Sequence, residues 1–439
     1  MKKIGVSIWT GMGERNLIQS GVIERLGLDY ELFHMNSDCS VFPHLLKGDH
    51  SFSTTKLDRM LQKISYEVGY HALWNQSGNS TQKKYINKLK SEALFEYRLK
   101  HYASLLYLHF RSNKRHDLFR DLCLLRKNSY FANLDAIFTT STDVAEDQML
   151  MYSSVRKGLP CVSLVHSWDN LPSRGLLPAH PDKLLVWNQP MLEQAVKFHN
   201  INPDKCDIVG APQYYLYRKL SEKSNKKVLK RRFNIQDEQK IITYTCTAKR
   251  FFPDEILFLK RFCEFVDSVG SLVIIIRLHP EATPSEYTQN FNLYKNVRFD
   301  LPDDGFRAKK AKGIGDIEKT KDFVCLMKNS DVVVNLASTT TLDAIAFDTP
   351  VICLKFNMSV LKKSWNAAEK WYQSEHFQDI DNMGAYDSAY DFDEFIKILT
   401  DVLNSPEKRK QERLSVVNLI IPDLDTPFLI KNSFKGVFR

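Results

Sequence analysis

Three groups of polar residues, each following a run of apolar or β-branched residues, contain side chains that could bind an anion. The groups are Thr247, Lys249 and Arg250; Arg277 and His279; and Ser338, Thr339, Thr340 and Thr341. Hydroxyl, ammonium, guanidinium and imidazole groups all donate hydrogen bonds to phosphate oxygens. The second half of the chain is therefore expected to hold a phosphate-binding site.

The third group lies in the most informative segment of the chain, from Asp331 to Ile352. This segment is typical of a buried strand, a hydroxyl-rich turn, a helix from about Thr340 to Phe347, and a further strand. A helix N-terminus presents unpaired backbone N–H groups that favour a phosphate. Thr340 and Asp343 could instead form a capping box, and the two roles are compatible.

His279 follows an apolar run and precedes Pro280, in the order Ile-Ile-Ile-Arg-Leu-His-Pro. An imidazole at this position could donate a hydrogen bond to a diphosphate leaving group, with the proline stiffening the turn. A purely structural turn residue is the alternative.

The first half of the chain contains candidates for a base. Glu14 follows Gly11 and Gly13, whereas His166 and Asp169 follow the apolar run Cys161–Val165. A carboxylate or an imidazole could deprotonate an acceptor hydroxyl. Alternatively, Glu14 only begins a helix and Asp169 only orders a loop, so the sequence leaves the identity of the base open.

Parallel sheets must position these groups, because β-branched runs alternate with helical patterns along the chain. Ligands of such sheets bind at the carboxyl ends of the strands, which is where the polar groups lie. The strands are expected at Lys3–Trp9, Tyr30–Met35, Ala136–Thr140, Cys161–Val165, Leu184–Trp187, Asp207–Val209, Lys240–Cys246, Leu272–Leu278, Asp331–Leu336 and Val351–Leu354. The first helix is expected at about Arg15 to Leu26.

The pattern predicts two domains, 1–212 and 213–410, and a tail, 411–439, that crosses back to the first domain. A helical insertion is expected at about 54–127, where glycine is almost absent. Its aromatic and basic residues could contact a charged glycan or lipid headgroups, or form an ordinary helical cap. These residues are Tyr97, Arg98, Lys100, Tyr102, Tyr107, Phe110, Arg111, Lys114 and Arg115.

The composition narrows the class of protein. The chain has 439 residues, 43% of them hydrophobic, and a formal charge of +9, which favours an anionic partner. Nucleic acid is not expected, because Lys and Arg are scattered and the densest cluster, Lys226–Arg232, has helical spacing. Eight cysteines without a C-x-x-C pair indicate a reducing compartment. With no signal peptide or apolar span expected, the prediction is a cytoplasmic protein, either soluble or peripheral on the inner face of the membrane.

The motifs Arg277-Leu-His-Pro280, Ser338–Thr341 and Asp348-Thr-Pro350 resemble the donor half of GT-B-fold glycosyltransferases of bacterial capsule and lipopolysaccharide synthesis. Similar signatures occur in Kdo transferases, sialyltransferases and CDP-glycerol glycerophosphotransferases. His166–Asn170 and Val186–Pro212 resemble the linker-proximal motifs of the same enzymes.

The resemblance implies an α/β GT-B fold, with two facing Rossmann-like domains, parallel sheets and a helical insertion in the first. It implies an inverting transfer of sugar from a CMP-, UDP- or related nucleotide sugar to a glycan or glycolipid. His279 and Ser338–Thr340 would contact the donor phosphates and Asp343 the ribose, beside Thr247, Lys249 and Arg277. The catalytic candidates are Asp169, Glu14 and His166. Neither a cofactor nor a metal is expected, with Asp303-Asp304-Gly305 the one loose acidic candidate.

Three other functions remain open. A CDP-polyol phosphotransferase would use the same His-Pro and Ser/Thr elements but would form a phosphodiester. A UDP-sugar 2-epimerase would need several carboxylates in one closed cleft and no acceptor. A non-catalytic glycan- or nucleotide-binding module would need no base at all.

Overall fold

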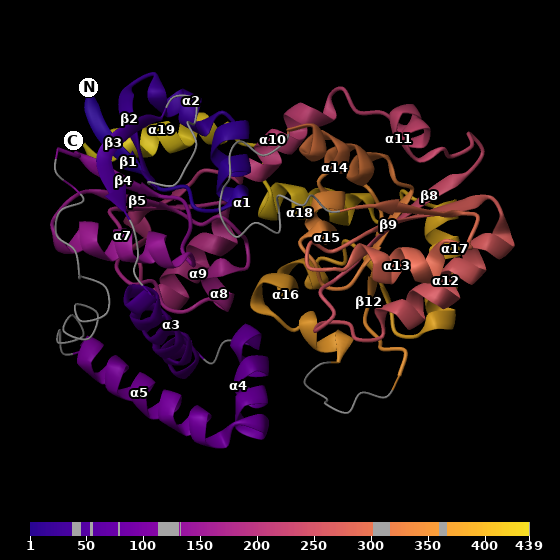
Figure 1. Cartoon of the computed structure of the whole chain (residues 1–439), viewed down its shortest axis with the longest axis horizontal. Coiled ribbons are helices and arrows are strands. Elements are labelled where there is room, and N and C mark those ends of the chain that lie inside the picture. Colours follow the sequence, from indigo (N-terminus) through magenta and orange to yellow (C-terminus); the bar gives the residue numbers. More distant parts are fainter. Residues whose placement is uncertain are drawn as a thin grey trace. The chain divides into compact units, whose positions relative to one another are not determined.

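The structure is a computed structural model that describes residues 1–36, 45–52, 56–77, 80–112, 131, 133–301, 317–359 and 367–438. These residues divide into two compact units. Unit 1 contains residues 1–216 and 419–438, and unit 2 contains residues 217–301 and 317–418. Unit 1 is therefore built from two segments that unit 2 separates in the sequence (Figure 1).

Unit 1 has a parallel sheet of seven strands, sheet A, in the order β3-β2-β1-β4-β5-β6-β7. The strands are β1 (Lys2–Val6), β2 (Tyr30–Asn36), β3 (Leu46–Phe52), β4 (Ala136–Thr139), β5 (Cys161–Leu164), β6 (Lys183–Val186) and β7 (Cys206–Ile208). After β1 the chain adds strands on one side, and from β4 it adds them on the other. The switch point between β1 and β4 is the usual ligand position of such a sheet.

The core of unit 1 includes a late segment of the chain, α19 (Thr426–Val437). Phe434 of α19 is fully buried, and its ring lies 5.4 Å from that of Phe138 and 5.9 Å from that of Tyr30. The Asn188 side chain also donates a hydrogen bond to the carbonyl of Ile420 at 2.6 Å. Both ends of the chain consequently lie in unit 1 (Figure 1).

The first helical region is not the single helix expected from Arg15 to Leu26. It comprises α1 (Gly11–Glu14), a π-helical segment (Arg15–Gln19) and α2 (Val22–Gly27). Gly21 separates the last two with a φ of 84°, a conformation that L side chains rarely adopt. The pattern alone did not reveal this break. The later helices of this unit are α7 (Ala145–Arg156), α8 (Asn170–Ser173) and α9 (Gln189–His199).

Three helices occupy the described part of the insertion: α3 (Lys56–Ser77), α4 (Ser80–Glu92) and α5 (Leu94–Ser112). Lys100 is turned inward, because it forms ion pairs with Glu67 and, at 2.5 Å, with Glu96. Lys100 was grouped with basic residues that could contact a glycan or lipid headgroups, but its side chain does not point outward to do so. The Tyr107, Phe110 and Arg111 side chains, together with Lys114 and Arg115, lie outside the described part.

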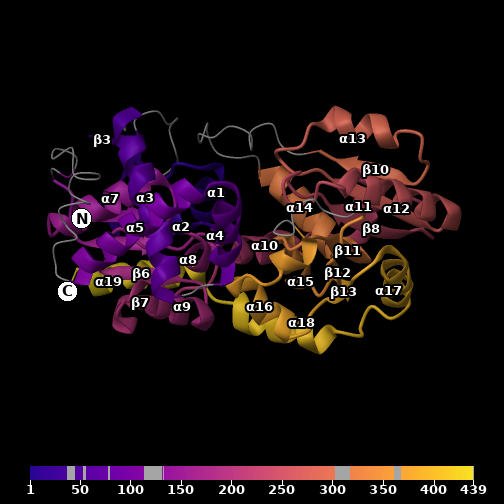
Figure 2. The same cartoon turned by 90° about the horizontal axis from the view of Figure 1, so that it is seen from below.

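Unit 2 has a parallel sheet of six strands, sheet B, in the order β10-β9-β8-β11-β12-β13. The labels of β10, β8, β11, β12 and β13 follow this order from top to bottom in Figure 2. Its switch point lies between β8 and β11. The strands are β8 (Lys240–Thr245), β9 (Leu272–Arg277), β10 (Val297–Asp300), β11 (Val332–Asn335), β12 (Val351–Leu354) and β13 (Asp387–Ala389). Two parallel Rossmann-like sheets confirm the fold class expected from the sequence.

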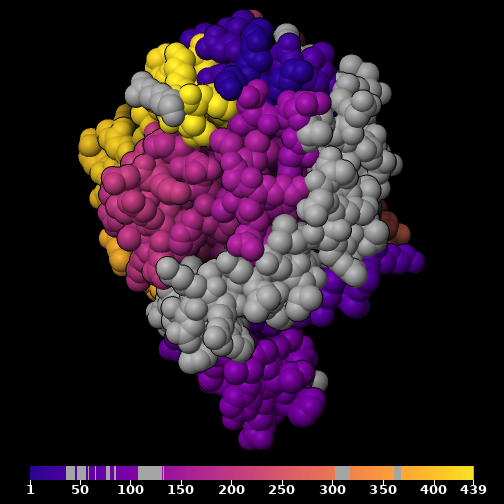
Figure 3. Space-filling view, turned by 90° about the vertical axis from the view of Figure 1, so that its left-hand side faces the viewer, coloured from indigo at the N-terminus to yellow at the C-terminus, as the bar shows by residue number. Residues whose placement is uncertain are grey.

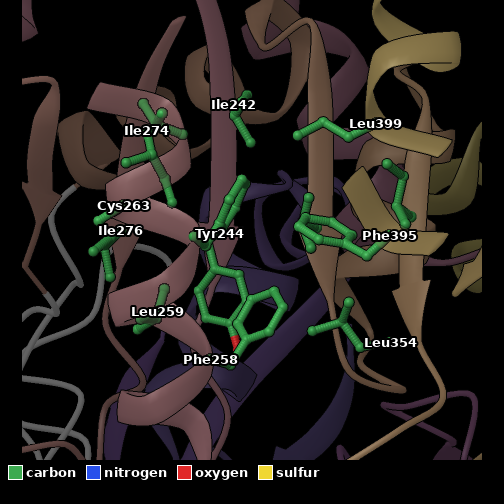
Figure 4. Close-up of a cluster of buried hydrophobic side chains, with 14 of the residues drawn as sticks. Ile242, Tyr244, Phe258, Leu259, Cys263, Ile274, Ile276, Leu354, Phe395 and Leu399 are labelled. Carbon is green, nitrogen blue, oxygen red and sulfur yellow. The ribbon is translucent and has the colours of Figure 1, made fainter. Parts of the chain in front are cut away.

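Aromatic side chains hold α12 (Glu255–Val269) and α17 (Phe392–Asn404) against sheet B. Figure 4 shows Tyr244 of β8 beside Phe258 of α12, in a cluster that also contains Phe395 of α17. The Phe395 ring lies 5.3 Å from that of Phe258 and 4.8 Å from that of Phe262. The other helices discussed are α10 (Pro212–Ser221), α11 (Lys226–Phe233), α13 (Pro284–Phe291), α14 (Ile317–Asn329), α15 (Thr340–Ile345), α16 (Glu375–Asn382) and α18 (Lys410–Ile420).

The basic cluster Lys226–Arg232 lies on α11 and makes contacts within unit 2. Lys226 forms an ion pair with Asp331 at 2.6 Å, and Arg232 forms one with Asp300 at 3.1 Å. Lys230 donates to the carbonyl of Gln236 at 3.0 Å. The cluster was expected to be a solvated helix face. Lys227, Arg231 and Arg232 are exposed, as expected, whereas Lys230 is buried.

Six cysteines in the described residues are buried as free thiols, as expected: Cys161, Cys206, Cys246, Cys263, Cys325 and Cys353. Cys39 and Cys123 lie outside the described residues. Within the part of the chain described, no helix combines the length and the apolar character needed to cross a bilayer.

Candidate functional site

The switch point of sheet A is formed by the segments that follow β1 and β4. The Thr140 hydroxyl donates to the carbonyl of Ser7 at 2.6 Å, which ties the two strand ends together. The Thr10 hydroxyl accepts a hydrogen bond from the N–H of Gly13 at 3.1 Å. A Cβ atom at Gly13 would lie only 3.6 Å from the Thr140 hydroxyl oxygen. The turn that carries Glu14 therefore lies against the end of β4.

Asp143, a residue that the sequence analysis did not select, lies close to two charged or titratable groups. His166 Nδ1 lies 3.5 Å from Asp143 Oδ1, and Arg174 Nε lies 3.2 Å from Asp143 Oδ2. The His166 and Asp143 side chains are only 10% and 18% exposed. Ser141 also donates to Asp143 at 2.6 Å. An imidazole, a carboxylate and a guanidinium thus meet beside the end of β4.

Arg174 connects this cluster to the insertion. Burial alone would lower the pKa of the Arg174 guanidinium, but the carboxylates of Asp143 and Asp169 outweigh burial and raise it. Its guanidinium also hydrogen-bonds the phenol of Tyr66 on α3. The backbones approach closely here, because a Cβ at Gly175 would lie 2.9 Å from the carbonyl oxygen of Tyr66. Glycine at position 175 therefore allows α3 to pack against the site.

His166 and Asp169 lie in the segment that follows β5, whereas Glu14 follows β1, which is separated from β5 by β4 in sheet A. Asp169 accepts hydrogen bonds from the Ser167 hydroxyl at 2.5 Å and the Ser173 hydroxyl at 3.2 Å. Glu14 is the last residue of α1 and is only 3% exposed. All three candidates therefore belong to the same edge of sheet A.

In unit 2, the hydroxyl turn lies at the switch point of sheet B. The Thr340 hydroxyl lies 2.9 Å from that of Thr245 at the end of β8, and it accepts from the Asn335 side chain at 3.2 Å. Thr341 in turn donates to the Asn335 side chain at 3.1 Å. These bonds fix the turn between β8 and β11. Thr340 does not form the alternative capping box, since the N-cap of α15 is Thr339, whose side chain makes no capping hydrogen bond.

The backbone of this turn is held in an uncommon conformation. Ala337 has a φ of 27°, which is rare for a residue with a Cβ. Its N–H donates to the Tyr372 hydroxyl at 2.8 Å, and that hydroxyl donates to the carbonyl of Leu354 at 3.1 Å. The Ser338 hydroxyl accepts from the N–H of Thr340 at 3.3 Å. Such conformations cluster at binding sites, where the surrounding structure maintains them.

A cavity of about 400 Å³ opens beside the ends of β8 and β9. Two of the predicted donor-binding residues, Thr247 and Lys249, line it. Lys249 forms an exposed ion pair with Glu286 at 3.0 Å, and Arg250 pairs with Glu281 at 2.5 Å. The cavity therefore has both basic and acidic groups at its wall.

Glu255 forms part of that wall and was not selected from the sequence. Its buried carboxyl group accepts hydrogen bonds from the Thr247 N–H at 2.8 Å, the Tyr244 hydroxyl at 3.0 Å and the Tyr287 hydroxyl at 2.6 Å. Burial raises the pKa of Glu255 from an ordinary 4.5 to about 7, although these bonds oppose the increase. A glutamate directly before the apolar run Ile256–Leu259 was the signal that could have revealed it.

His279 lies in a turn at the end of β9, as expected. Its Nδ1 accepts a hydrogen bond from the N–H of Glu281 at 3.1 Å. Burial lowers the pKa of His279, and the nearby Arg250 lowers it further, against an opposing effect of Glu281. In the neutral imidazole the proton is consequently on Nε2, which can donate to a ligand.

Of two other predicted donor residues, Arg277 has structural partners and Asp343 is buried. Arg277 forms an ion pair with the buried carboxylate of Asp300 and lies 4.5 Å from the Phe323 ring. Asp343 is only 4% exposed on α15. Donor binding by Arg277 would compete with its ion pair, so both roles stay predictions.

In the part of the chain that the structure describes, no group of three or more His, Cys, Asp or Glu side chains is arranged to hold a metal ion. The acidic candidate Asp303-Asp304-Gly305 lies outside the described residues.

Solved structures with a similar fold cover nearly the whole chain. A putative UDP-N-acetylglucosamine 2-epimerase from Listeria monocytogenes has a TM-score of 0.59 at 10% identity, over 100% of this chain and 97% of its own. The S. aureus MnaA structure with UDP has a TM-score of 0.57 at 10% identity, with the same two coverages. The UDP-GlcNAc 2-epimerase of Neisseria meningitidis, bound to UDP-GlcNAc, has a TM-score of 0.55 at 14% identity, over 99% and 100%.

No family model matches the sequence, and no curated protein does so either. At identities of 10–14% the structural likeness establishes the fold alone. The narrower resemblance to Kdo transferases and sialyltransferases gains no support from these structures. The chain thus has the GT-B architecture of two Rossmann-like units, each with a candidate site at its switch point.

Proposed function

We propose that this chain is an inverting glycosyltransferase that moves a sugar from a nucleotide-activated donor to a surface glycan or glycolipid. The observation that carries the proposal is the pair formed by His166 and Asp143 at the edge of sheet A. An inverting transfer needs one base, placed to remove a proton from the acceptor hydroxyl. A buried imidazole beside a carboxylate suits this task.

The pair assigns a role to each nitrogen of the imidazole. Nδ1 of His166 lies 3.5 Å from Asp143 Oδ1 without a hydrogen bond between them, and a closer approach would favour a proton on Nδ1 and leave the Nε2 lone pair available. Nε2 takes the proton of the acceptor hydroxyl while the hydroxyl oxygen forms a bond to the anomeric carbon. The bond from that carbon to the diphosphate breaks, and its electron pair leaves with the nucleotide.

The other candidates are less suited to removing a proton. Asp169 accepts hydrogen bonds from Ser167 and Ser173, so both of its oxygens are already engaged. Asp143 is held by Arg174 and Ser141, and its role is to orient His166. Glu14 remains the competing base.

Unit 2 would bind the donor. The Nε2–H of His279 and the hydroxyls of Ser338 and Thr339 supply hydrogen bonds to the diphosphate, with Lys249 adding positive charge. Thr340 would act indirectly, since its hydroxyl fixes the turn against Thr245. The ordered turn supports a preformed site in this unit, and so does the cavity of about 400 Å³ that Thr247 and Lys249 line.

The first experiment identifies the donor. Thermal unfolding of the full chain is measured with CMP, CDP, UDP, GDP and UDP-sugars, because a bound ligand raises the unfolding midpoint by mass action. Turnover of the stabilising donor is then compared for His166→Gln, Asp169→Asn and Glu14→Gln. His166→Gln should reduce turnover by roughly 10²–10⁴-fold while leaving nucleotide binding unchanged. Full turnover of this variant, with loss in Glu14→Gln, would reassign the base.

Epimerisation at C2 of a UDP-sugar is the second candidate. Solved structures of the same fold are UDP-GlcNAc 2-epimerases, and Glu14, Asp143 and Asp169 supply several carboxylates at one sheet edge. Epimerisation would incorporate solvent deuterium at C2 without any acceptor. Glycosyl transfer would instead release nucleotide in proportion to a glycosidic product, and a phosphodiester product would indicate polyol-phosphate transfer. NMR of the products separates the three reactions.

A further inference from the structure

Helix α5 exposes an apolar face and packs its polar face inward. Phe95, Leu99, Tyr102 and Leu106 recur at intervals of four, three and four residues, which places them on one side of the helix. They are 82%, 63%, 64% and 57% exposed. Four large apolar side chains in water on a single helix face are unusual for the surface of a soluble domain.

The opposite face of α5 carries polar groups that contact α3. The Asn75 side chain donates to the fully buried Ser104 hydroxyl at 2.7 Å. Lys100 forms its ion pair with Glu67, and the Tyr97 ring lies 6.2 Å from that of His71. These contacts fix the rotation of α5, so the apolar face cannot turn inward without breaking them.

The N-terminal part of α3 has a similar exposed surface. Leu57, Met60 and Ile64 are 43%, 53% and 44% exposed at intervals of three and four residues. Exposed basic residues alternate with them. Figure 3 shows the purple helical lobe, which includes α4 and α5, projecting from unit 1. The apolar surface thus belongs to the insertion and is separate from the site at the edge of sheet A.

Charge indicates the kind of partner. Among the exposed side chains that the structure describes on α3, α4 and α5, six are basic and two are acidic. The basic ones are Lys56, Arg59, Lys63, Lys83, Lys90 and Arg98, and the acidic ones are Glu92 and Glu96. A second copy of this chain would bring two such positive surfaces together. An anionic lipid surface instead complements both the charge and the apolar side chains.

We propose that the outer face of α5 docks this protein on an anionic lipid bilayer. Phe95, Leu99, Tyr102 and Leu106 enter the boundary between headgroups and acyl chains, while Arg98 and neighbouring lysines contact the lipid phosphates. This docking goes beyond the proposed transfer reaction and does not depend on it. It would bring a lipid-linked acceptor to the protein.

The test is co-sedimentation of the full chain with vesicles. The wild-type chain should sediment with vesicles of phosphatidylglycerol and phosphatidylcholine, and much less with phosphatidylcholine alone. The double variant Phe95→Ser, Leu99→Ser should lose affinity for the anionic vesicles by roughly tenfold or more. The matched control Leu257→Ser, Leu293→Ser, at residues of unit 2 that are 47% and 89% exposed, should bind like the wild type.

Two charge-reversal variants complete the test. Arg98→Glu should weaken binding to the anionic vesicles, whereas Lys260→Glu, at an exposed position of α12, should not. None of these changes should lower the thermal unfolding midpoint, because all lie on exposed faces. Equal vesicle binding of the Phe95/Leu99 variant and the wild type would overturn the proposal. So would wild-type dimerisation without vesicle binding, since it would assign the face to a second copy. Neither result depends on the nucleotide-sugar activity.

Discussion

Replacing Glu255 with glutamine changes one titrating group and leaves the shape of the cavity wall almost unaltered. The Glu255 carboxyl group accepts hydrogen bonds from Tyr244, Tyr287 and the N–H of Thr247. A glutamine can keep the bonds to its carbonyl oxygen, and its amide nitrogen can donate to the Tyr287 oxygen. The variant therefore isolates the effect of the proton from that of packing.

The sign of the effect follows from the raised pKa. The folded protein keeps the Glu255 proton up to a pKa of about 7, whereas the unfolded chain releases it near the ordinary pKa of 4.5. Between these pH values the folded state binds one more proton, so its stability falls as the pH rises. The slope is about 1.4 kcal/mol per pH unit, and the whole window is worth roughly 3 kcal/mol.

Urea unfolding of the full chain, followed by circular dichroism across this pH window, measures the effect. The free energy of unfolding of Glu255→Gln minus that of the wild type should increase by roughly 3 kcal/mol from acid to neutral pH. Glu238→Gln, at an exposed position of the same unit, serves as the control and should show a flat difference. If the Glu255→Gln difference is also flat, burial does not hold the proton on Glu255.

Phe434→Ala should lower the free energy of unfolding by about 3–5 kcal/mol, because the Phe434 side chain is fully buried. Phe428 lies on the same helix but is 41% exposed, so Phe428→Ala should lower the free energy of unfolding far less. Equal thermal midpoints of the two variants would contradict the role of α19. His279→Ala should raise the Kd for UDP in calorimetry without altering the unfolding midpoint; an unchanged Kd would leave the imidazole a turn residue. Turnover should persist in EDTA, because hydroxyl and basic donors neutralise the leaving diphosphate, and strict dependence on Mg²⁺ or Mn²⁺ would refute this.

The interior strands and the edge strand β7 were readable from the sequence, but the other three edge strands were not. Strands buried on both faces appear as β-branched runs, and Leu272–Leu278 became β9 with almost the expected bounds. The edge strands β3, β10 and β13 have polar residues at half or more of their positions, and polar residues are common in edge strands. Their pairing depends on a neighbouring strand, which a local pattern does not reveal.

The candidate site was readable where it follows directly from a strand. His166 and Asp169 come just after β5, and the same rule applied to β4 would have reached Asp143. Arg174 and Tyr66 follow no such rule. They meet because α3 packs closely against Gly175, a contact between segments more than a hundred residues apart. No spacing along the chain predicts that contact.

The position of α19 in the core of unit 1 has a consequence for synthesis. The ribosome must make residues 217–418 before it makes the helix that covers Phe138 and Tyr30. At about 5–20 residues per second, that delay is roughly 10–40 s. All of unit 2 is made before α19, so it can finish folding first, while Phe138 and Tyr30 of unit 1 still lack the helix that covers them. A chain released before residue 426 would keep this apolar surface uncovered and would be expected to aggregate.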